Sequence, residues 1–206
     1  ASNMDLASAC RLMYRGYLYS LVLLAASIVL LVSAVFVEFS DPASPYLGVL
    51  AFAALPLGAA GFAVVLLIHR GFMALSRLGV RWAGVQARLL TALFVVELSL
   101  LALGLLRRER PLLQDLPQDA ALAIVLAVLG LVWGLALAYL ATHVLYLKHM
   151  YRHTGVLRFH TAYVVTLVGV AFLVPVVTAP LGLLILFAAH VVEMLAYREA
   201  SRGWSS

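Results

Sequence analysis

The sequence predicts an all-α, polytopic integral membrane protein with six transmembrane helices and both termini in the cytoplasm. Hydrophobic residues make up 65% of the 206-residue chain, charged residues only 11%, and the mean hydropathy is +1.07. Soluble domains are about half apolar and about a quarter charged. The apolar stretches are long and lack the period-two alternation of membrane barrels. Together these observations exclude a soluble enzyme, a disordered chain and a fibrous repeat.

Each apolar stretch is close to the roughly 20 residues that a helix needs to cross a bilayer. The predicted spans are residues 17–39, 46–68, 89–106, 120–146, 159–177 and 181–197. The last two come from one long tract, which the breaker Thr178-Ala179-Pro180 divides into a hairpin. No polar segment is long enough for a second domain, so residues 1–206 are predicted to form a single transmembrane domain. Ala1–Asn3 precede Met4 and are expected to be a cloning remnant.

The basic residues predict the orientation of the chain. With the N-terminus in the cytoplasm, eleven of the 14 lysines and arginines lie on the inner side, and only Arg107, Arg108 and Arg110 lie outside. An excess of cations on cytoplasmic loops is the usual pattern of multi-pass proteins. The net charge of +5 is therefore explained by basic inner loops. We expect the lipid bilayer of the cell membrane as a partner and no nucleic acid.

Ionisable groups inside predicted spans are the first candidates for a functional site, because they are costly in a bilayer. Glu97 lies near the centre of the third span, and His190 near the centre of the sixth. Glu193 follows His190 by one helical turn on the same face. A carboxylate beside an imidazole can share a proton, as a relay requires. The alternative is that these groups are interhelical hydrogen-bonding contacts without further function.

Two prolines interrupt predicted spans. Pro56 lies in the second span and Pro175 in the fifth, and each frees a backbone carbonyl four residues earlier. Freed carbonyls line cavities in transporters, but ordinary kinks have the same cause. Gly130 and Gly134 form a GxxxG pattern in the fourth span, which favours close helix approach within the chain or across a homo-oligomer.

The remaining histidines lie near the predicted inner boundary of the membrane. His149 and His153 have a spacing that can bind a divalent metal if the helix continues through both. A b-type haem needs axial histidines at matching depth, and an interfacial role is the simplest alternative. We expect no cofactor, with haem b or a divalent metal as the alternative. The histidines concerned are His69, His143, His149, His153 and His160.

Two predicted inner loops share a Gly-Val pair before a basic and aromatic entry into the next span, at Gly79-Val80 and Gly155-Val156. A duplicated hairpin and convergence of interfacial loops both account for this. The second loop contains Tyr151, Thr154, Gly155, Val156 and Phe159. In these residues the last third of the chain resembles small multi-pass archaeal membrane proteins of unknown function. The resemblance implies a helical membrane fold and no known activity.

Three functions are compatible with these features. The first is a small transporter or channel-like protein with Glu97, His190 and Glu193 along the path of a small solute or proton. The second is a membrane-embedded haem or metal-binding redox subunit. The third is a non-catalytic scaffold or assembly protein. An enzyme is disfavoured, because no nucleophile and base are predicted together at a suitable depth. The chain also contains no Walker loop, GxSxG elbow, dinucleotide fingerprint or HExxH motif.

Overall fold

The computed structural model describes residues 5–40, 46–109, 118–173 and 178–203. Within these ranges the chain forms helices and no strand, which confirms the predicted all-α class. The helices are α1 (Leu6–Ser40), α2 (Tyr46–Arg77), α3 (Ala83–Glu109), α4 (Gln118–Thr154), α5 (Leu157–Leu173) and α6 (Ala179–Gly203). Ala1–Asn3 and the whole connection between α3 and α4, residues 110–117, lie outside the described residues.

Most of the helices are suited to a bilayer. Five of them, α1, α2, α3, α4 and α6, are long and apolar enough to cross a membrane, which identifies a membrane protein by composition and length. The exception is α5, with 17 residues. At the helical rise it is about 26 Å long, slightly less than the roughly 30 Å of a hydrocarbon core. The predicted division of the last apolar tract is confirmed, because α5 and α6 are separate helices that pack against each other.

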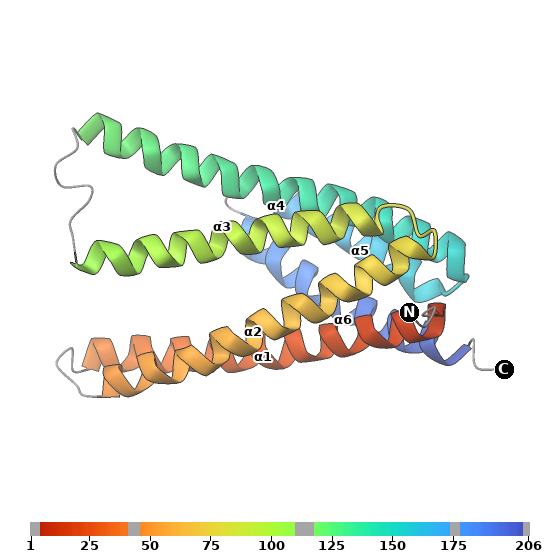
Figure 1. The fold of residues 1–206 in the computed structure, drawn as a ribbon, viewed down its shortest axis with the longest axis horizontal. Helices are drawn as coiled ribbons and strands as arrows, with labels where there is room; N and C mark the ends of the chain where they lie inside the picture. The colour runs from red at the N-terminus through yellow and green to blue at the C-terminus, as the bar shows by residue number, and fades with distance from the viewer. Residues whose placement is uncertain (1–4, 41–45, 110–117, 174–177, 204–206) are drawn as a thin grey trace.

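The helices form a ring in chain order. Each one contacts its successor, and α6 contacts α1, which closes the ring. Figure 1 shows the two termini at one end, beside the α2–α3 and α4–α5 connections. The α1–α2 pair and the α3–α4 pair diverge toward the opposite end, and the α5–α6 hairpin is shorter than either pair (Figure 1). We call the first of these ends the termini end.

The buried core is concentrated at the termini end. Its largest fully buried side chains include Met13, Phe72, Tyr146, Phe159 and Tyr197, which come from α1, α2, α4, α5 and α6. The remaining lengths of the helices expose a nearly continuous surface of large apolar side chains. Such a surface is unfavourable in water and suits contact with lipid.

Local sequence explains where several helices begin and end. Asp5 caps α1 by accepting a hydrogen bond from the backbone N–H of Ser8 at 2.7 Å. The hydrogen bonds from Ser8 lower the pKa of this exposed carboxyl. At the other end of the next helix, Gly79 has φ of +82° and its neighbour Val80 bonds back to the carbonyl of Leu75 at 3.0 Å. This is a Schellman ending.

The α4–α5 connection also has a left-handed glycine, since Gly155 has φ of +70°, but the N–H of Gly155 bonds to the carbonyl of Tyr151 at 2.8 Å, which is the simpler αL ending. Val80 is buried in the core, and the partly buried Val156 packs against the same core. The two loops that look alike in sequence therefore share a left-handed glycine at the helix end and a valine that packs on the core, although their hydrogen bonds differ.

Replacing Gly79 with alanine is expected to destabilise the fold by about 1–2 kcal/mol, because a Cβ disfavours the left-handed conformation. No atom lies within 4 Å of the added Cβ, so the cost is conformational and not steric. Thermal unfolding in detergent measures it. Gly61→Ala is the matched control, since Gly61 lies in the interior of α2 with equally open surroundings. That variant is expected to be neutral or slightly stabilising.

Candidate functional site

A cluster of polar side chains surrounds Glu193 of α6, whose side chain is almost fully buried. Oε1 of Glu193 accepts hydrogen bonds from the hydroxyls of Tyr17 at 2.8 Å and Tyr197 at 3.0 Å. Its Oε2 lies 2.8 Å from Nε2 of His143. Helices α1, α4 and α6 thus converge on one carboxylate at the termini end of the ring.

His143 is fixed from its other side by Gln86 of α3. Nε2 of Gln86 donates to the carbonyl oxygen of Tyr139 at 3.1 Å and to the hydroxyl of Thr142 at 2.6 Å. These bonds orient the amide so that its oxygen faces Nδ1 of His143, at 3.2 Å. Because an amide oxygen only accepts hydrogen bonds, Nδ1 of His143 carries a hydrogen.

This arrangement defines a site for one proton. With Nδ1 occupied, Nε2 of His143 and Oε2 of Glu193 share one further proton. The pair is either imidazolium with carboxylate or neutral imidazole with carboxylic acid. Both forms have no net charge, which suits a buried position among apolar helices. Loss of the shared proton leaves one negative charge, which the two tyrosine hydroxyls on Oε1 help to stabilise.

Two branches extend from Glu193. On one side, Tyr197 also hydrogen-bonds to Tyr146. Since the Tyr197 hydroxyl donates its hydrogen to Glu193, the Tyr146 hydroxyl is the donor in this second bond. On the other side His190 stacks on Tyr17, with ring centroids 4.3 Å apart, and its Nε2 lies 2.8 Å from the hydroxyl of Ser20. Every buried side-chain nitrogen and oxygen of the described residues has a hydrogen-bond partner.

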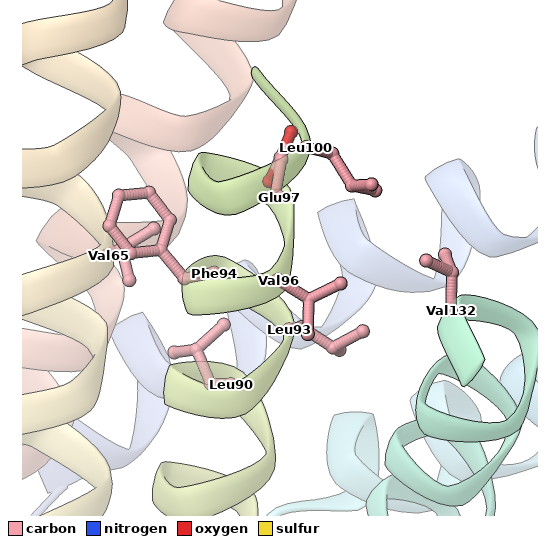
Figure 2. A pocket seen from close by; sticks show the side chains of 8 residues that line it. All are labelled: Val65, Leu90, Leu93, Phe94, Val96, Glu97, Leu100 and Val132. Carbon is pink, nitrogen blue, oxygen red and sulfur yellow. The ribbon is translucent and has the colours of Figure 1, made fainter. Parts of the chain in front are cut away.

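Two of the three predicted path residues, His190 and Glu193, belong to this cluster, and both contact Tyr17. Glu97 does not belong to it. Its side chain is exposed and lines a pocket between α2, α3 and α4 (Figure 2). His190 contacts Ser20, which lies near the start of the predicted first span.

The other predicted histidines lie apart from Glu193. Nδ1 of His69 is 3.2 Å from the carbonyl oxygen of Ala87, which ties α2 to α3. Since α4 continues through Thr154, His149 and His153 do share a helix face, with ring centroids 6.2 Å apart. The exposed ring of His160 contacts tyrosines of α4 and α5. No three His, Cys, Asp or Glu side chains in the described ranges are placed to hold a metal ion.

Of the predicted kinks, Pro56 lies inside the continuous helix α2, and Pro175 falls outside the described residues. Gly130 and Gly134 of α4 face open space, since an added Cβ would meet nothing within 4 Å. The close helix contacts within the chain are made by other glycines. A Cβ on Gly16 would lie 2.6 Å from Ile68, and one on Gly182 would lie 2.9 Å from the backbone of Leu173. A homo-oligomer through the Gly130–Gly134 face stays a prediction.

Sequence reasoning missed the central partners of Glu193. The sequence predicts His143 only as a boundary ligand and gives no indication of Tyr17 or Gln86. Tyr197 follows Glu193 by four residues, and this helical spacing is a usable local signal. Tyr17 and His143 lie on other helices, as does Gln86, which contacts His143, so no local pattern indicates them.

No protein-family model matches the chain, and no curated protein or solved structure shows significant similarity to it. The resemblance to archaeal multi-pass membrane proteins therefore stays a prediction.

Proposed function

We propose that the protein is a small transporter of the cell membrane that couples movement of a small solute to protons. In this proposal the chain has six spans with both termini in the cytoplasm, and the Glu193–His143 pair holds the exchangeable proton. The observation that carries the proposal is a carboxylate buried among membrane-type helices, with one oxygen 2.8 Å from an imidazole nitrogen. Intramembrane ionisable groups with defined partners are typical of proton relays in transporters.

The distribution of cations supports the proposed orientation. Arginines gather at the termini end, where Arg158, Arg198 and Arg202 line one pocket together with Leu195 and Glu199. A basic end and a long apolar surface match a cytoplasmic face and a lipid-facing belt. The Glu193 cluster then lies in the cytoplasmic half of the protein, close to the compartment with which it would exchange protons.

The network provides a means of coupling protonation to helix position. Glu193 is held by Tyr17 of α1 and His143 of α4, which come from the two diverging helix pairs. Loss of the shared proton changes the charge at Oε1 and Oε2, and thereby the strength of both contacts. A change at one carboxylate can therefore shift the balance between two arrangements of the helix pairs, as alternating access requires.

The test is a comparison of wild-type protein with Glu193→Gln in proteoliposomes on a solid-supported membrane. The amide oxygen of glutamine can accept from Tyr17 and Tyr197, and its nitrogen can donate to Nε2 of a neutral His143. The variant therefore keeps the hydrogen bonds and removes the exchangeable proton. We expect wild-type currents that respond to a pH gradient for at least one solute class, and a reduction of about tenfold or more in the variant.

The solute panel contains amino acids, sugars, organic cations and inorganic anions. Glu199→Gln is the matched control, because Glu199 is an exposed acid on the same helix that pairs with Arg158 at 3.0 Å. Its currents are expected to equal those of the wild type. If Glu193→Gln carries wild-type currents, or if no solute evokes a current in the wild type, the cluster is a structural network and the proposal fails.

A further inference from the structure

A second carboxylate lies in surroundings very different from those of Glu193. Glu97 of α3 lines a pocket of about 440 Å³ with Val65 of α2 and Val132 of α4. In Figure 2, Phe94 is directed toward Val65, and Val96 is directed toward Val132. The pocket thus lies where α3 separates from both of its neighbours. Its volume is in the range of small-molecule sites, about 300–1,000 Å³.

The lining combines one negative charge with apolar and aromatic surface. Apart from Glu97, every lining residue is aliphatic or phenylalanine: Val65, Leu90, Leu93, Phe94, Val96, Leu100 and Val132. Phe94 stacks on Phe62 of α2, with ring centroids 5.4 Å apart. Aromatic faces attract organic cations, and the attraction grows when water is excluded.

We propose that this pocket binds a lipophilic organic cation, in which a delocalised or shielded positive charge is surrounded by apolar groups. Building on the proposed transport function, we assign such cations as the solute class. A carboxylate in the middle of a membrane-type helix is costly when ionised, and a bound cation offsets that cost. The apolar walls select against small hydrated cations, which would lose their water without gaining polar ligands.

Helix α3 connects this pocket to the proton site. Gln86, which orients His143, and Glu97 lie on the same helix, eleven residues apart. At the helical rise this separation is about 16 Å. The two carboxylates therefore occupy separate sites, and a shift of α3 would act on both. Movement of α3 would therefore couple cation binding to proton binding, although no residue binds both.

Binding of tetraphenylphosphonium to the detergent-purified full chain tests the proposal, by equilibrium dialysis or calorimetry. We expect saturable binding by the wild type and a loss of about tenfold or more in affinity for Glu97→Gln, since one charge pair is removed. Val132→Trp fills the pocket and is expected to weaken binding similarly, while keeping Glu97. Tetraphenylborate, an anion of the same shape, is expected to show no saturable binding.

Ser99→Ala is the matched control, because the Ser99 hydroxyl bonds to the carbonyl of Val95 on the same helix and does not line the pocket. Its affinity is expected to equal that of the wild type. Three results would each overturn the inference. The first is an affinity of Glu97→Gln within about twofold of wild type. The others are absence of binding by the wild type and equal binding of tetraphenylborate. If binding fails while Glu193→Gln still abolishes currents, only the assigned solute class is wrong. If binding holds and the currents do not depend on Glu193, the cation site stands and the proton site falls.

Discussion

Replacement of Glu193 by alanine is expected to lower the free energy of unfolding by about 3–5 kcal/mol, the usual cost of breaking a buried ion pair from one side. The truncation leaves Tyr17, Tyr197 and His143 without their common acceptor in a buried position. Cys10 supplies the measurement, because it is the single cysteine of the chain and is fully buried. Its reaction with a fluorescent maleimide during heating in detergent reports unfolding.

Glu199→Ala is the control for this experiment, since the Arg158–Glu199 pair is about half exposed and exposed pairs contribute about 0–1 kcal/mol.

A second comparison separates the effect of the unpaired charge from the effect of lost packing. In the double variant Glu193→Leu with His143→Leu, no unpaired charge remains, so part of the lost stability is expected to return. If Glu193→Ala unfolds at the wild-type temperature, the hydrogen bonds of the cluster do not contribute to the fold.

Replacement of Gly182 by leucine is expected to separate the α5–α6 hairpin and to destabilise the protein by about 3 kcal/mol or more, because overpacking of a tight contact forces the backbone to move. A Cβ at Gly182 would lie 2.9 Å from the nitrogen of Leu173 and 3.0 Å from the carbonyl oxygen of Gly169. Both are backbone atoms of α5, so no side chain can rotate away. The same Cys10 labelling measures the loss.

Gly130→Leu is the matched control, since Gly130 is also a helical glycine but has open space around it. This variant is expected to be neutral or slightly stabilising, because leucine is the better helix former. If Gly182→Leu is as stable as Gly130→Leu, the close approach of α5 and α6 is not essential to the fold. If Gly130→Leu is the more damaging of the two, that face is packed in the working protein, as an oligomer through Gly130 and Gly134 would require.

The helical fold could be predicted because the bilayer demands long apolar segments, and composition shows them directly. The break before Pro180 was predicted for a local reason, since proline suits the first turn of a helix and not its interior. The functional cluster was only partly predictable. Glu193 and His190 were predictable because both are ionisable residues inside a predicted span. The partners of Glu193, Tyr17 and His143, are far away in sequence. The contact of α6 with α1 brings Tyr17 to Glu193, and the position of α4 brings His143 to it.

Depth was the least predictable property. The third and sixth apolar runs each placed an ionisable group near the centre of a span, which suggested that Glu97 and His190 lie at one level. The helices extend unequally beyond their apolar runs, and α1 and α4 are much longer than α5. An apolar run therefore predicts that a helix exists, while packing against neighbouring helices sets the position of that helix along the bundle.

The short α5–α6 hairpin has a consequence for how the two chain ends are placed. A hairpin returns to the side from which it started, whether it passes through both leaflets or turns back between them. The α1–α2 and α3–α4 pairs also return the chain to the termini end (Figure 1). In the proposed topology the two ends therefore share a compartment, whatever depth the hairpin reaches. A fluorescent tag on either end would report the same side, and only a probe in the turn between α5 and α6 would measure how far the hairpin penetrates.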